Sequence, residues 1–148
     1  MATTVSSIMT QAKIIAAASL GATWKEMPSV FNLESNDLRR GAKSYGVKPG
    51  AASGADTVTN SYALDHVFEL ILMDKNPRKD SEAQALAVID DLYDKQDTIY
   101  KAMVRAKLNL GGTVLLVSNP SLSEPEFINS RELIALRQQF TVKYRQAI

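Results

Sequence analysis

The chain has no cysteine and only one histidine among its 148 residues. Without cysteine it can form no disulfide, and it has no thiol nucleophile or thiolate metal site. Imidazole-based metal sites are almost excluded as well, because a single histidine cannot supply the usual set of ligands. This composition suits a cytosolic or particle-bound protein.

Long apolar runs are also missing. No segment approaches the roughly 18 consecutive apolar residues that span a bilayer. The segment from Met1 to Leu20 has an apolar centre, but its only basic residue, Lys13, lies inside it, so the charged leading region of a secretory signal is absent. We therefore expect a soluble chain with no targeting segment and no membrane partner.

The net charge is close to zero. Seventeen basic residues against sixteen acidic ones give a formal charge of +1. This balance argues against general nucleic-acid binding through a positive field, and it leaves a local basic patch open. A chain of this length with 45% hydrophobic residues can bury about 70% of its unfolded surface, so we expect one domain over residues 1–148.

Two long segments alternate as half-buried strands. In the C-terminal segment, Leu133 to Ile148, apolar and polar residues occupy opposite sides. The apolar side holds Ile134, Leu136, Phe140, Val142 and Tyr144, and the polar side holds Arg137, Gln139, Thr141, Lys143 and Arg145. The other segment, Tyr62 to Met73, becomes apolar on both sides in its later half, which predicts a central strand.

Apolar residues at helical spacing predict two helices. The first follows a threonine cap and stops at Gly21. The longest element spans about 82–108, after Ser81 and Gln84, which have the spacing of a capping box. It is expected to end at the glycine pair 111–112.

Shorter strands are expected around residues 44–48, 113–118 and 126–129. Together these elements predict an α+β fold, in which a mixed, mainly antiparallel sheet is packed by one long helix and an N-terminal helix. Residues Pro49 to Asp56 are small and nearly uncharged, so we predict a flexible loop near 49–60 that joins two strands as an extended hairpin.

His66 would be the obvious general base if the chain were an enzyme. It lies on the apolar side of its strand, between Leu64 and Phe68, and no strained serine turn accompanies it. Asp65 points to the opposite face and cannot orient the ring. We interpret His66 as a core or interface residue with local hydrogen bonds.

The carboxylates Asp90, Asp94 and Asp97 have helical spacing and could line one helix face. A carboxylate-bridged metal pair would also need histidines on facing helices, and the chain lacks them. Lys95 and Lys101 interleave with these acids, which indicates a solvated face. The sequence thus predicts no catalytic residue, no metal site, no cofactor and no small-molecule substrate.

Basic residues form several groups that are candidate interface residues. None has the glycine-rich cradle of a nucleotide loop or the interleaved aromatics of a single-strand groove. Each group alone suits a solvated surface, and contact with an acidic protein surface or with passing DNA is the further possibility. The residues are Arg39, Arg40, Lys43, Lys48, Lys75, Arg78, Lys79, Arg137, Lys143 and Arg145.

The order of these elements resembles that of the tail terminator proteins of long-tailed bacteriophages, small α+β proteins that form a hexameric ring at the end of the tail tube. The resemblance rests on the strand from Asp65 to Asp74, the helix beginning at Asp80-Ser81-Glu82, and the terminal strand from Leu136 to Tyr144. It covers nearly the whole chain and depends on the pattern and order of the elements.

The resemblance implies a structural virion protein of the tail or neck, assembled in the host cytoplasm and without enzymatic activity. The implied partners are further copies of the chain in a homohexamer, the tail tube protein, a head connector or neck protein and, in contractile phages, the tail sheath. DNA would pass transiently through the lumen of the ring.

Three alternatives stay open at the level of the sequence. One is a head completion or connector protein of the neck, which is also a ring of small subunits. Another is a small enzyme that depends on His66. The third is a peptide-binding module that adds a partner strand at a sheet edge.

Overall fold

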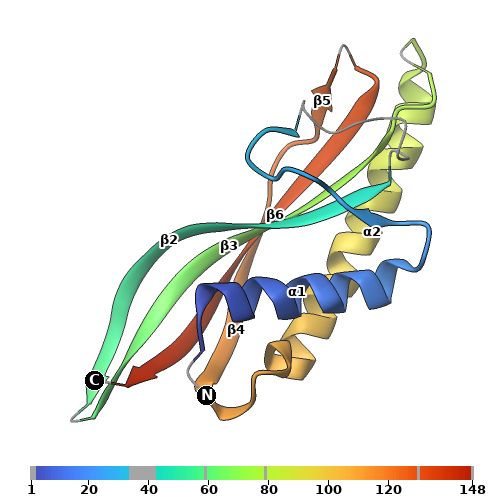
Figure 1. Cartoon of the computed structure of the whole chain (residues 1–148). Helices are drawn as coiled ribbons and strands as arrows, with labels where there is room; N and C mark the ends of the chain where they lie inside the picture. The colour runs from blue at the N-terminus through green and yellow to red at the C-terminus, as the bar shows by residue number, and fades with distance from the viewer. Residues whose placement is uncertain (1–2, 34–42, 59, 79, 130, 148) are drawn as a thin grey trace.

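The computed structural model describes residues 3–33, 43–58, 60–78, 80–129 and 131–147. Their fold is α+β, as predicted, with both α-helices on one face of a long twisted sheet (Figure 1). In chain order the described elements are α1 (Val5–Leu20), β1 (Lys25–Glu26), β2 (Ser44–Val58), β3 (Ser61–Lys75), α2 (Glu82–Ala106), the 3₁₀ turns η3 (Lys107–Asn109) and η4 (Gly111–Thr113), β4 (Val114–Leu122), β5 (Glu126–Ile128) and β6 (Leu133–Ala147).

The sheet has the strand order β1-β2-β3-β6-β4, and β5 also pairs with β6. The short β1 runs parallel to β2, and the other described pairings are antiparallel. The central position expected for the Tyr62 to Met73 strand is confirmed, because β3 lies between β2 and β6. Leu72, for example, is opposite Tyr45 on one side and Leu136 on the other.

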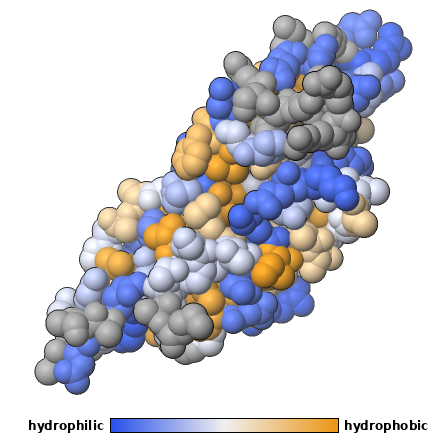
Figure 2. Space-filling model, viewed as in Figure 1, coloured by the Kyte–Doolittle hydropathy of each residue, from blue (hydrophilic) through white to orange (hydrophobic). Residues whose placement is uncertain are grey.

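The main core lies between the sheet and the two helices. Phe68 of β3 and Phe140 of β6 are fully buried and stack with ring centroids 5.9 Å apart. Leu92 and Ile99 from α2 and Ile8 from α1 are also fully buried. Burial of each large apolar side chain contributes about 1.5–3 kcal/mol. On the outer surface of the helix layer, apolar and hydrophilic residues are interspersed (Figure 2).

A smaller core covers the opposite face of the sheet at one end only. The segment that follows β1, together with β5, packs there on the later half of β3, whose Ile71 and Met73 are buried. The predicted burial of this half on both faces is therefore confirmed. The cluster consists of Met27, Leu33, Ile71, Met73, Ile128, Leu133 and Ala135.

The predicted flexible loop at 49–60 is wrong for its described residues up to Val58, which belong to β2. The predicted extended hairpin is present, with its turn between Val58 and Ser61. Side-chain composition misled the prediction, because small residues add little to a core while their backbones still pair with β3. The register shifts at two places, between Pro49 and Ala52 and between Gly54 and Asp56, and at each of them β2 has one residue more than β3, as in a β-bulge.

Both helices start where the sequence predicts. Thr4 caps α1, and the Ser81 hydroxyl accepts a hydrogen bond from the backbone N–H of Gln84. The long helix ends earlier than the glycine pair, because Lys107 and Leu108 already have φ of 46° and 56°. This left-handed turn carries Leu108 back into the core, where it is fully buried. The burial of Leu108 compensates for the left-handed backbone conformation, which costs about 1 kcal/mol or more of free energy per residue.

Candidate functional site

The face of the sheet that points away from the helices is open near the β2–β3 turn. Along β6, Phe140, Val142 and Tyr144 are buried toward the helices, whereas Thr141 and Lys143 between them are partly exposed on the open face. The predicted alternation of the terminal strand is therefore confirmed. The smaller core covers only the other end of this face, so the polar side of β6 remains accessible here.

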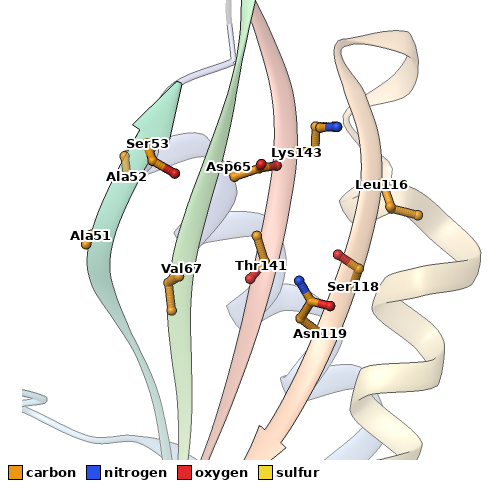
Figure 3. Close-up of a pocket in the computed structure, with 10 residues that line it drawn as sticks. All are labelled: Ala51, Ala52, Ser53, Asp65, Val67, Leu116, Ser118, Asn119, Thr141 and Lys143. Atoms are coloured by element: carbon orange, nitrogen blue, oxygen red, sulfur yellow. The ribbon is translucent and has the colours of Figure 1, made fainter. Parts of the chain in front are cut away.

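A hollow of about 550 Å³ lies on this open face. Its walls come from β2, β3, β6 and β4, and in Figure 3 the lining side chains lie in front of these strands with the helices behind. The lining is mainly small, hydroxyl-bearing or aliphatic. It consists of Ala51, Ala52, Ser53, Asp65, Val67, Leu116, Ser118, Asn119, Thr141 and Lys143.

Two basic residues of β6 lie on the open face. Lys143 is directly opposite Asp65 of β3 in the strand register, so a charge of each sign lines the hollow. Arg145 is two residues further along, and its Nη1 donates to the hydroxyl of Ser61 at 3.4 Å. This part of the face is weakly basic, and its width over several strands suits a protein or polymer surface better than a small ligand.

Arg137 ties three strands together on the same side of β6. Its Nη1 lies 2.7 Å from Glu69 Oε1 of β3, and its Nε lies 2.6 Å from Glu126 Oε1 of β5. Partial burial lowers the pKa of Arg137, but its hydrogen bonds and charge interactions with Glu69 and Glu126 outweigh that effect and raise the pKa overall. Two carboxylates therefore balance this charge within the chain, and Arg137 stabilises the sheet.

Two further basic residues, Lys43 just before β2 and Lys48 within it, lie further from the β2–β3 turn. Lys43 Nζ is 3.9 Å from Asp74 Oδ2 and 5.7 Å from the ring centroid of Trp24. Lys48 Nζ is 5.8 Å from the ring centroid of Phe31, a residue that is 73% exposed. Cation–π contacts of this length are worth about 0.5–1 kcal/mol at exposed sites. Both lysines therefore help to fix the segment after α1 onto β2.

The remaining candidate residues lie at or beyond the end of β3. Lys75 is exposed, and Arg78 Nε lies 3.3 Å from Asp80 Oδ1 in a solvent-exposed pair. The structure thus separates the predicted basic groups, with Lys43, Lys75 and Arg78 at one end of the sheet and Lys143 and Arg145 at the other. Three further candidates lie outside the described residues: Arg39, Arg40 and Lys79.

His66 is buried, and both of its ring nitrogens are hydrogen-bonded. Nε2 lies 3.0 Å from the backbone oxygen of Gly50, which can only accept, so Nε2 carries the proton. Nδ1 then accepts from the Tyr144 hydroxyl at 3.2 Å. The ring also stacks on Phe68 with centroids 4.5 Å apart. These contacts match the sequence interpretation of His66 and leave no nitrogen free for a substrate.

Carboxylates on the outer face of α2 pair with neighbouring lysines. Lys95 contacts Asp91 at 3.0 Å, and Lys101 contacts Asp97 at 2.8 Å. Across the described residues, no group of three or more potential ligands could hold a metal ion. In that same part of the chain, no helix combines the length and apolarity needed to cross a membrane.

Sequence reasoning missed the hollow itself. Ala51, Ala52 and Ser53 were assigned to a loop, although they form one wall of the hollow as part of β2. The glycine at position 50 is the sequence feature that could have indicated this strand pairing. A Cβ atom at this position would lie 2.9 Å from the backbone oxygen of Val67, so the two strands approach more closely than a side chain allows.

Comparisons with known proteins give one kind of match. No protein family model matches the chain, and no curated protein matches it. Among known structures, the chain is similar to one from "Virion of native gene transfer agent (GTA) particle", with a TM-score of 0.52 and 11% sequence identity. The similarity covers 97% of this chain and 100% of the virion chain, so the two share a fold over essentially their whole lengths.

Proposed function

We propose that this chain is a structural virion protein that forms a ring at the end of a phage-type tail tube, as tail terminator proteins do. The observation that carries the proposal is the fold similarity to a chain of a virion particle over essentially the full length of both chains. The order of elements in the sequence supports the same assignment. A structural role of this kind needs contact surfaces and requires no chemistry.

The open face of the sheet supports an assembly role. Its hollow extends over several strands and is lined mainly by short polar and aliphatic side chains, so it suits a protein or polymer, such as DNA in the lumen of a ring, better than a small ligand. The buried polar group that would be the best catalyst, His66, uses its ring nitrogens to hold Tyr144 and Gly50. An enzymatic use of His66 would require at least one of these bonds to be broken.

The proposed partners follow from the position of such a ring. Further copies of the chain complete a homohexamer, tail tube protein lies on one side, and a head connector or neck protein lies on the other, with a tail sheath where the tail is contractile. Lys143 and Arg145 would meet DNA phosphates transiently, through charge and without sequence readout. The proposed location is the virion tail or neck, after assembly in the host cytoplasm.

Electron microscopy of labelled chain mixed with assembled tail tubes tests this function. We expect label at one end of each tube, because a terminator caps the growing end. Label along the tube wall, or no label on tubes, would contradict the proposal. Label on isolated head connectors with none on tube ends would assign the chain to the neck. A control chain with Leu86→Lys changes an exposed helix residue and should bind tube ends like the wild type.

A further inference from the structure

The two outer long strands of the sheet carry few charged residues, with none in β4 and only Lys48 and Asp56 in β2. We infer that the free edge of β4 in one copy pairs with the free edge of β2 in the next copy and that this pairing builds the ring, an inference that rests on the proposed function. Exposed strand edges of soluble monomers are usually protected by charge, proline or a covering element, because unpaired backbone groups recruit other strands. Each edge strand does hold one proline, Pro120 in β4 and Pro49 in β2, but β4 carries no charge, and among the described strands only β1 covers part of either edge.

The edge of β4 has no charged residue from Val114 to Leu122. The backbone N–H of Ser123 donates to the carbonyl of Arg137 at 2.9 Å, so the odd-numbered residues of β6 direct their backbone groups toward β4. The even-numbered residues of β6, such as Val142, direct theirs toward β3. Val117 is opposite Val142, so the N–H and C=O of Val117 point away from β6. No described strand pairs with that side of β4.

Among the described strands, only β1 pairs with the outer edge of β2, at Ser44 and Tyr45 near the start of the strand. Met27 donates its N–H to the carbonyl of Tyr45 at 2.8 Å, so the backbone groups of Tyr45 point away from β3. By strand alternation those of Val47 and Pro49 do the same. Pro49 has no N–H, so at this outward position it leaves the pairing with β3 intact and offers the next copy only its carbonyl.

Strand direction makes the two edges compatible. From β2 through β3 and β6 to β4, each described pairing is antiparallel, so β4 runs opposite to β2. Rotation about an axis along the strands places β4 of one copy beside β2 of the next, in antiparallel orientation. The contact is head-to-tail, and closure of the ring leaves no free edge of either strand.

The same arrangement decides which face of the sheet points inward. The helices occupy one face and add bulk there, so they must lie outside a closed cylinder (Figure 1). The open face with its hollow then lines the channel, and it brings Lys143 and Arg145 of every copy to the channel wall.

Disulfide trapping tests the pairing, and the absence of native cysteine makes introduced thiols unambiguous within this chain. Ser53 and Leu116 both line the hollow from the two edge strands, and both are exposed (Figure 3). The Ser53→Cys/Leu116→Cys variant is assembled with tail tube protein, oxidised and analysed on denaturing gels through a tag on this chain. Ala51→Cys/Leu116→Cys and Ser53→Cys/Ser118→Cys extend the scan to neighbouring registers.

We expect a ladder of covalent oligomers in at least one of the three pairs, and no ladder when Leu86→Cys replaces the β4 cysteine. A ring of unchanged native mass in which none of the pairs forms a ladder would overturn the pairing and leave the proposed function intact. A covalent dimer of the Ser53→Cys or Leu116→Cys single variant would also overturn the pairing, because two β2 edges or two β4 edges would then meet. Wild-type chain that stays monomeric beside the tube overturns the proposed function and this inference together.

Discussion

The Gly50→Ala substitution should distinguish an ordered β2 from a mobile loop. A Cβ atom at residue 50 would lie 2.9 Å from the backbone oxygen of Val67, well inside ordinary van der Waals contact. The obstacle is backbone, so one strand must shift, and the hydrogen bond from His66 to the Gly50 carbonyl is strained with it. Overpacking of this kind costs about 1–3 kcal/mol.

Urea unfolding followed by circular dichroism measures this effect. With a slope of about 2 kcal/mol/M, the unfolding midpoint of Gly50→Ala should fall by about 0.5–1.5 M while the slope stays constant. Gly54→Ala is the matched control, because no atom lies within 4 Å of a Cβ there. It should be neutral or slightly stabilising, as for glycine in a compatible conformation. Equal midpoints for the two variants would refute an ordered β2.

Two further predictions concern β6. Arg137→Met keeps the aliphatic packing but leaves Glu69 and Glu126 without their shared cation, so we expect a loss of about 1–2 kcal/mol in the free energy of unfolding, measured by urea titration. Lys101→Met, which breaks an exposed pair on α2, should cost less than about 0.5 kcal/mol. An equal loss in the two variants would contradict the stabilising role of Arg137 between Glu69 and Glu126. Burial, together with the charge of Tyr62, raises the pKa of Tyr144 above 10.0, so the folded state retains this proton more strongly than the unfolded state. Its contribution to stability is present below pH 10 and is lost as the pH rises further, so Tyr144→Phe should flatten the decline in stability above pH 10, and an unchanged decline would contradict this reasoning.

The sequence predicted those elements that leave a periodic side-chain signal. The terminal strand alternates because one face meets the helices, and Phe140 and Val142 are buried there while Lys143 is not. The start of α2 was predictable because Ser81 caps it through a local hydrogen bond. Both signals arise within a few residues along the chain, so neither needs knowledge of distant contacts.

The remaining features depend on contacts between distant residues. The order of residues 49–58 comes from backbone pairing with β3, which leaves almost no trace in small side chains. The role of Arg137 depends on Glu69, which is 68 residues away along the chain. The end of α2 is set by the burial of Leu108, and this outweighs the stop that the glycine pair suggests. The candidate site combines both kinds of feature, so only its β6 side was predictable.

The central claim is that this chain assembles into a ring of six on the tail tube. Native mass spectrometry of the chain at micromolar concentration, mixed with tail tube protein, tests that claim most directly. We predict a species that contains six copies of the 16.2 kDa chain, bound to tube protein or released from it intact. A chain that remains a monomer in that mixture would contradict the account.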